Sequence, residues 1–142
     1  MVTDGQGIPL AGICSSASNS EYNLILPTLN QVHVENRPLH VRKRLDCIIA
    51  DKGYDAKWLR QAIRSKRMTP YIPKRRKPGQ IEEPSYNQKI KPFYRTRWIV
   101  ERSFSWLGNF RRVVTRYERL LCNYHAFFQL ACIMICLNWV LK

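Results

Sequence analysis

The sequence lacks the features that direct a protein out of the cytosol or cross-link it with disulfides. Residues 1–15 do not combine a basic start with an apolar stretch, as a secretory signal peptide would. The five cysteines are odd in number and form no CxxC pair, so we expect reduced thiols that pack in a core. Cys122 and His125 lie close enough for a metal site, but no second pair accompanies them, and packing is the simpler interpretation. We therefore expect a cytoplasmic protein.

The sequence also lacks an apolar run long enough to predict a membrane span. Residues 126–141 are rich in apolar side chains, but the segment is short and includes Gln129 and Asn138. Because a membrane-spanning helix needs about 20 apolar residues, we expect a buried core helix here. No basic amphipathic helix suited to an anionic membrane surface stands out either. We expect no membrane partner.

Acidic residues are scarce, and the positive charge is unevenly placed. The chain has 24 Lys and Arg against 10 Asp and Glu, a formal net charge of +14. Residues 41–121 hold 22 of the basic residues and seven acids, a net of +15, whereas residues 1–40 have a net of −2. Such concentrated charge is most often compensated by a phosphate backbone, so it predicts a nucleic-acid partner. A solvated basic face without a partner is the plain alternative.

The length of 142 residues and the 45% of hydrophobic residues suit one folded domain. Turn residues at Asp4–Gly7 predict a hairpin whose first strand is so short that we expect the chain to begin inside a larger fold. Beyond it, the pattern predicts an α/β domain. Its expected elements are helices over 20–32, 56–66 (capped by Asp55) and 123–141, a long helix from Pro92, strands over 45–50 and 68–73, and a loop over 74–91.

Two carboxylates are the candidates for chemistry. Asp51 follows a buried strand, where open α/β sheets place functional groups, although a turn residue is the plain interpretation. Glu101 lies on the helix after Pro92, in one stripe with Tyr94 and Arg97, while the opposite side is apolar and packs inward. A salt-bridged surface group is the plain alternative for Glu101. Together the two acids suggest ligands for Mg²⁺ or Mn²⁺.

Several motifs resemble one family, the DDE transposases of bacterial insertion sequences. Residues 50–55 (Ala-Asp-Lys-Gly-Tyr-Asp) resemble its second-acid motif, and Tyr94-x2-Arg97-x3-Glu101 resembles its Tyr-Arg-Glu-Lys signature. Residues 100–118 and 2–10 are similar to the same family in order and spacing. The resemblance implies an RNase H-like mixed sheet flanked by helices, here without its first strand. Residues 1–142 would then form one N-terminally truncated catalytic domain that cleaves and joins DNA with two divalent ions.

The resemblance also assigns roles to individual residues. Asp51 and Glu101 match the second and third acids, which are catalytic and bind metal. Tyr94 and Arg97 match residues that hold the DNA backbone, and we add Arg102 as a further DNA contact. The lysine of the signature is replaced by Gly108. A helical count places Arg112 on the same stripe, so we expect Arg112 to supply the missing phosphate contact.

Three interpretations stay open, because the family's first acid lies upstream of the turn at Asp4. Asp4 itself is better explained as a turn residue. The chain is then an active transposase, or a noncatalytic DNA-binding remnant, or an unrelated basic module that binds RNA or DNA. Metal-dependent DNA cleavage separates the first interpretation from the second. A homo-oligomer is possible, and we expect Asp51 and Glu101 to share one surface.

Overall fold

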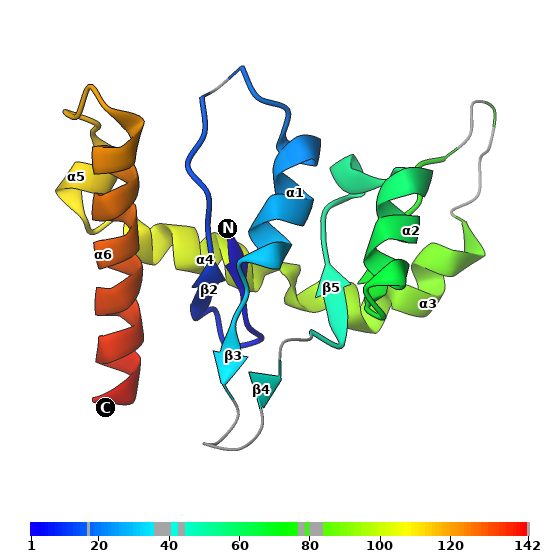
Figure 1. Ribbon diagram of the computed structural model, residues 1–142. Helices are drawn as coiled ribbons and strands as arrows, with labels where there is room; N and C mark the ends of the chain where they lie inside the picture. Colours follow the sequence, from blue (N-terminus) through cyan, green and yellow to red (C-terminus); the bar gives the residue numbers. More distant parts are fainter. Residues whose placement is uncertain (17, 36–40, 43–44, 77–78, 80–83, 142) are drawn as a thin grey trace. The chain divides into compact units, whose positions relative to one another are not determined.

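The computed structural model describes residues 1–16, 18–35, 41–42, 45–76, 79 and 84–141. The chain forms two compact units, which we name the terminal unit (Met1–His33 and Ile99–Lys142) and the central unit (Val34–Trp98). Figure 1 shows the helices and short strands of both, coloured along the chain. This content agrees with the predicted α/β class. That the two units work as one catalytic domain stays a prediction.

The terminal unit contains the predicted hairpin. Strands β1 (Val2–Thr3) and β2 (Pro9–Ala11) pair antiparallel. The Asp4 carboxylate closes the turn, since its Oδ1 accepts the backbone N–H groups of Gln6 and Ile8 at 2.8 Å each. The interpretation of Asp4 as a turn residue is therefore confirmed.

The second half of the terminal unit contains a small apolar cluster. Leu107, Phe128, Ala131 and Ile135 form its buried centre. Helix α5 (Arg111–Val114) lies beside one half of helix α6 (Leu121–Val140) (Figure 1). The helices of this unit are α1 (Glu21–Asn30), α4 (Trp98–Leu107, whose first residue belongs to the central unit), α5 (Arg111–Val114) and α6 (Leu121–Val140).

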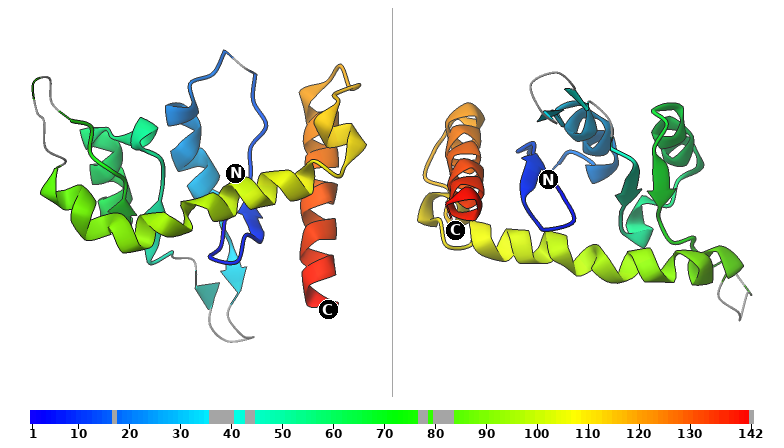
Figure 2. Two further views of the ribbon diagram at one scale, coloured as in Figure 1. Left: turned by 180° about the vertical axis from the view of Figure 1, so that it is seen from behind. Right: turned by 90° about the horizontal axis from the view of Figure 1, so that it is seen from below.

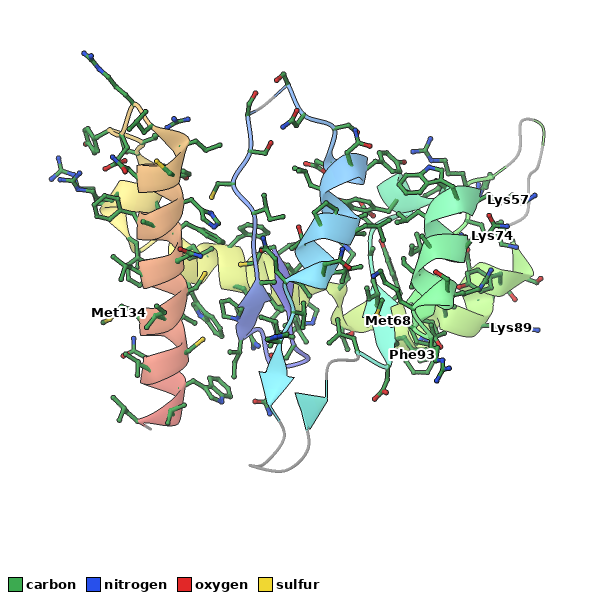
Figure 3. All side chains as sticks on the ribbon, viewed as in Figure 1. Lys57, Met68, Lys74, Lys89, Phe93 and Met134 are labelled. Carbon is green, nitrogen blue, oxygen red and sulfur yellow. The ribbon has the colours of Figure 1, made fainter. Side chains whose placement is uncertain are left out.

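The prediction that α6 is a buried core helix is right for one face only. In its most apolar stretch, of mean hydropathy 1.3, 17% of the residues are buried. Met134 is 47% exposed and points outward in Figure 3. Helix α6 is long and apolar enough to cross a membrane by length and composition alone, a criterion that core helices of soluble proteins also meet. Burial along α6 thus follows one packed face rather than the apolar content of the whole helix.

The cysteines follow the packing prediction in part. All five are free, and Cys14 and Cys132 pack against the apolar cluster. Burial raises the pKa of the Cys132 thiol to about 11, so this thiol stays neutral at physiological pH. Cys47 and Cys122 are exposed, and for them the prediction of core packing is wrong.

The central unit is built on a parallel strand pair with a crossover helix. Its core includes Leu59 and Ile63 of helix α2 (Lys57–Ser65), together with Ile72 and Ile90. Helix α3 runs crosswise to α2 (Figure 2, left view). The unit contains an antiparallel pair, β3 (Val34–Glu35) and β4 (Val41–Arg42), and the parallel pair β5 (Cys47–Ile49) and β6 (Thr69–Tyr71), with the helices α2 (Lys57–Ser65) and α3 (Ser85–Tyr94).

The long helix predicted from Pro92 is wrong at both ends. Helix α3 already contains Pro92, a single turn η2 (Arg95–Arg97) of 3-10 helix follows, and α4 ends at Leu107. Glycine has a low helix propensity, and the chain turns at Gly108 directly after α4. A count of 100° per residue therefore fails across η2 and beyond α4.

The loop predicted over 74–91 is also wrong at its C-terminal end, where α3 begins. The periodicity there is weak, but tertiary contacts hold the helix. Ile90 is 3% exposed, and the Tyr86 hydroxyl donates to the carbonyl of Pro70 at 2.7 Å. Packing thus outweighs local preference in this segment. The part of the predicted loop at 77–78 and 80–83 lies outside the described residues.

Gly12 provides a test of the packing in the terminal unit. A Cβ added at Gly12 would lie 2.5 Å from two ring atoms of the buried Phe128. We expect Gly12→Ala to lower the free energy of unfolding by about 1–3 kcal/mol, measured by urea denaturation. Gly5→Ala is the matched control, because a Cβ at Gly5 has nothing within 4 Å. Equal stability of the two variants would contradict the described packing.

Candidate functional site

Asp51 stands where β5 ends, as the sequence predicted. It caps the 3-10 turn η1 (Lys52–Tyr54), and its Oδ1 accepts the backbone N–H of Lys52 at 2.7 Å. The same oxygen accepts the hydroxyl of Tyr94, from the end of α3, at 2.9 Å. Asp51 remains exposed. Its carboxylate is therefore held in place and still open to a ligand.

A second carboxylate, Asp55, closes the loop that Asp51 opens. Arg60 of α2 donates to Asp55 Oδ1 through Nε at 2.9 Å and Nη2 at 2.7 Å. The backbone N–H of Arg75 donates to Asp55 Oδ2 at 2.7 Å, and the Arg75 guanidinium reaches the Gly53 carbonyl at 3.2 Å. The predicted cap role of Asp55 is wrong, since the N-cap of α2 is Ala56 and Asp55 is used by this ion pair.

The pKa of Asp55 reflects these contacts. Burial acts to raise the pKa of the carboxyl, but the Arg75 backbone N–H and the Arg60 guanidinium together outweigh burial and hold the pKa below its ordinary value. Asp55 is thus a charged structural residue at neutral pH.

Aromatic contacts fix the end of α3 that carries Tyr94. The rings of Tyr71 in β6 and Phe93 in α3 stack with centroids 4.3 Å apart. Phe93 is labelled in Figure 3. The Arg97 guanidinium lies 5.9 Å from the centre of the Tyr94 ring. Asp51, Tyr94 and Arg97 therefore lie in one part of the central unit.

Glu101 and Arg102 belong to the terminal unit. Glu101 is exposed on α4. Arg102 donates to the Gln6 carbonyl at 2.6 Å, and its guanidinium lies 5.0 Å from the centre of the Trp106 ring. Because Asp51 belongs to the central unit, the predicted proximity of Asp51 and Glu101 stays a prediction, as does a DNA contact by Arg102.

Arg112 does not continue the stripe of Tyr94, Arg97 and Glu101. It lies on α5, beyond the break at Gly108, and forms an ion pair with Glu118 at 2.7 Å. Its guanidinium also lies 5.0 Å from the centre of the Phe127 ring. The helical count that aligned Arg112 with the site was wrong, so its predicted phosphate contact loses that support.

Positive charge is concentrated on the unit that contains Asp51. The central unit holds 18 Lys and Arg against six Asp and Glu, a net of +12, and the terminal unit holds six against four, a net of +2. Lys57, Lys74 and Lys89, labelled in Figure 3, extend outward from the central unit. This distribution favours a polyanion at the central unit.

A divalent cation fits the chemistry of Asp51. Both hydrogen bonds that the structure gives its carboxylate use Oδ1, and no hydrogen bond to Oδ2 is seen among the described residues. An exposed carboxylate oxygen is a ligand that Mg²⁺ accepts. The described part of the chain contains no group of three or more His, Cys, Asp or Glu suited to a metal ion. Asp51 would thus need ligands from elsewhere.

Sequence reasoning missed two features of this site. One is the hydrogen bond from Tyr94 to Asp51, since the motif indicated only that both residues are functional. The other is the group of Asp55, Arg60 and Arg75. Arg60 directly follows Leu59 and lies three residues before Ile63, and both of these are buried. An arginine beside such an apolar face was the available signal that it needs a buried partner.

Asp51 follows the carboxyl end of a parallel strand, where open α/β sheets bind ligands, and the basic charge of the unit suits a nucleic-acid backbone. A family model of the transposase DDE domain matches residues 1–139. A Burkholderia cepacia protein that carries the name of a transposase for insertion sequence element IS402 is 35% identical over 139 residues. The match covers 97% of this chain and 61% of that protein. No solved structure matches. The chain belongs to the family of DDE transposases of insertion sequences.

Asp55→Asn tests the ion pair beside the site. It leaves the Arg60 guanidinium, 8% exposed, without a carboxylate, so we expect a loss of about 2–4 kcal/mol in unfolding free energy at pH 7. The folded pKa of Asp55 is lowered, so its contribution is present above the unfolded pKa near 4 and is lost as the pH falls through the folded pKa.

Urea denaturation at pH 7 and at about pH 3 measures this difference. The gap between wild type and Asp55→Asn should narrow at the acid pH. Asp46→Asn, which changes an exposed acid of the same unit, is the control and should stay within about 1 kcal/mol of wild type. A gap that is equally wide at both pH values would exclude the charge of Asp55 as its source.

Proposed function

We propose that this chain carries catalytic machinery for DNA cleavage and strand transfer at the ends of an insertion sequence. The observation that carries the proposal is the Asp51 carboxylate, held at the end of β5 by Lys52 N–H and Tyr94 OH and exposed to solvent. Membership of the DDE transposase family supports the reaction class. The proposal includes an RNase H-like fold built from both units.

Asp51 and Glu101 are the proposed ligands of the divalent ions, Mg²⁺ or Mn²⁺. When bound, such ions activate the attacking oxygen and stabilise the leaving oxygen of an in-line phosphoryl displacement. The task of Asp51 is to present an oriented carboxylate oxygen. Arg97, whose guanidinium has five N–H donors, is suited to hold a backbone phosphate beside Asp51.

DNA is the proposed partner, in a bacterial cytoplasm. The net charge of +12 on the central unit supports binding to the phosphate backbone without sequence readout. The match spans 61% of the B. cepacia relative. We therefore propose recognition of the transposon ends only for the longer protein. A homo-oligomer belongs to the same proposal.

The alternative is a noncatalytic DNA-binding protein of the same family. The Asp4 carboxylate accepts two backbone N–H groups of its own turn, so it is poorly suited to be the family's first acid. A Mg²⁺-dependent cleavage assay on DNA carrying insertion-sequence ends separates the two functions. DNA binding without cleavage by this chain would support the noncatalytic alternative.

The two acids are tested in a version of the chain extended upstream by a segment with the first acid. Asp51→Asn and Glu101→Gln should each reduce Mg²⁺-dependent cleavage by at least about a hundredfold, because each removes a metal ligand. DNA affinity, measured by gel shift, should stay within a few-fold. Asp46→Asn is the control exposed acid and should cleave normally. Full cleavage by either acid variant would refute its assignment.

Salt dependence tests the DNA surface. If six or more phosphates are engaged, affinity for a nonspecific duplex should fall by roughly a thousandfold between 50 and 200 mM salt. The double variant Lys57→Ala/Lys89→Ala in the central unit should lower the salt slope by about 2. Arg111→Ala/Arg119→Ala in the terminal unit is the matched control with a smaller change. The opposite order of the two variants would contradict the proposed surface.

A further inference from the structure

We infer that Tyr94 is a positioning residue that holds the Asp51 carboxylate in its metal-binding orientation. The inference rests on the proposed function of Asp51 and names how that residue is kept ready. The Tyr94 hydroxyl donates to Asp51 Oδ1 at 2.9 Å, across 43 residues of sequence.

The two donors to Asp51 act together. The backbone N–H of Lys52 and the hydroxyl of Tyr94 both reach Oδ1, from η1 and from α3. A carboxylate gripped at one oxygen by two donors from different elements loses much of its rotational freedom. Its other oxygen is then directed away from both donors, where a cation can approach. Outer partners of this kind orient metal ligands in general.

Tyr94 is itself fixed by the sheet that ends at Asp51. The neighbouring Phe93 stacks on Tyr71 of β6, with the rings 7° from parallel. Tyr71 pairs with Ile49 of β5, and its carbonyl accepts the backbone N–H of Ala50 at 3.4 Å. Strand β5 thus pairs with β6, β6 contacts α3 through Tyr71 and Phe93, and α3 contacts Asp51 through Tyr94. These contacts fix the position of the Tyr94 hydroxyl within the central unit.

In this inference the Tyr94 hydroxyl is used for Asp51 rather than for the DNA backbone. A phenol has one O–H donor, and donation to Asp51 leaves none for a phosphate oxygen of DNA. The Arg97 guanidinium lies beside the Tyr94 ring, and a guanidinium is a group suited to phosphate. The two residues of the motif would thus have different roles. Tyr94 orients the Asp51 carboxylate, and Arg97 contacts the DNA backbone.

The test measures Mn²⁺ binding to the 142-residue chain by electron paramagnetic resonance of free Mn²⁺, without DNA. Tyr94→Phe should weaken Mn²⁺ binding about tenfold, because it removes an outer partner of the ligand. Tyr86→Phe is the matched control, since it removes a hydroxyl from the same helix that donates to Pro70 rather than to Asp51. Tyr86→Phe should bind Mn²⁺ as wild type does, and Tyr94→Phe should keep wild-type DNA affinity.

Other outcomes would overturn the inference in distinguishable ways. Unchanged Mn²⁺ affinity with weakened DNA binding in Tyr94→Phe would return Tyr94 to a phosphate contact. Equal loss of Mn²⁺ affinity in Tyr94→Phe and Tyr86→Phe would show general loosening of the unit. Asp51→Asn tests the proposed function separately: it should abolish Mn²⁺ binding. Binding that survives Asp51→Asn would remove Asp51 as the metal ligand and with it the proposed function. No Mn²⁺ binding by the wild-type chain would overturn the inference that Tyr94 holds a metal ligand ready in this chain.

Discussion

The buried guanidinium of Arg60 is the constraint on which the central unit depends. A charge at 7% exposure is stable only if it is paired and its N–H groups are satisfied. Arg60 meets this need from three directions: the Asp55 carboxylate after η1, the Ile72 carbonyl after β6, and the face of the Tyr86 ring in α3. The Arg60 side chain of α2 thus contacts the loop around η1, the end of β6 and helix α3.

The position of Asp51 depends on the contact between Arg60 and Asp55. Asp51 and Asp55 are the first and last residues of one short loop around η1, so fixing Asp55 limits how far Asp51 can move. Arg75 adds a second point, because its guanidinium binds the Gly53 carbonyl inside the same loop. With both ends of the loop held, a single hydroxyl from Tyr94 is enough to choose an orientation for the Asp51 carboxylate.

The sequence predicted the elements well where the apolar periodicity and the turn residues agreed. The hairpin at Asp4, the strand before Asp51 and the helix over 20–32 are confirmed because local turn chemistry and apolar spacing specify them. It failed where tertiary contacts decide, as in α3, and where one glycine ends a helix, which misplaced Arg112. Motifs identified Asp51 and Tyr94, but no pattern within one sequence could predict that they bond to each other across 43 residues.

The two carboxylates of this loop, Asp51 and Asp55, have partners of different charge. Asp55 is paired with a cation, which cancels its charge and makes it a poor ligand for a further positive ion. Asp51 is held by a peptide N–H and a phenol, two neutral donors that orient the carboxylate without cancelling its charge. In the proposed function, the two neutral donors would preserve the negative charge at Asp51 for a divalent cation, and the positive charge around it would serve the DNA backbone.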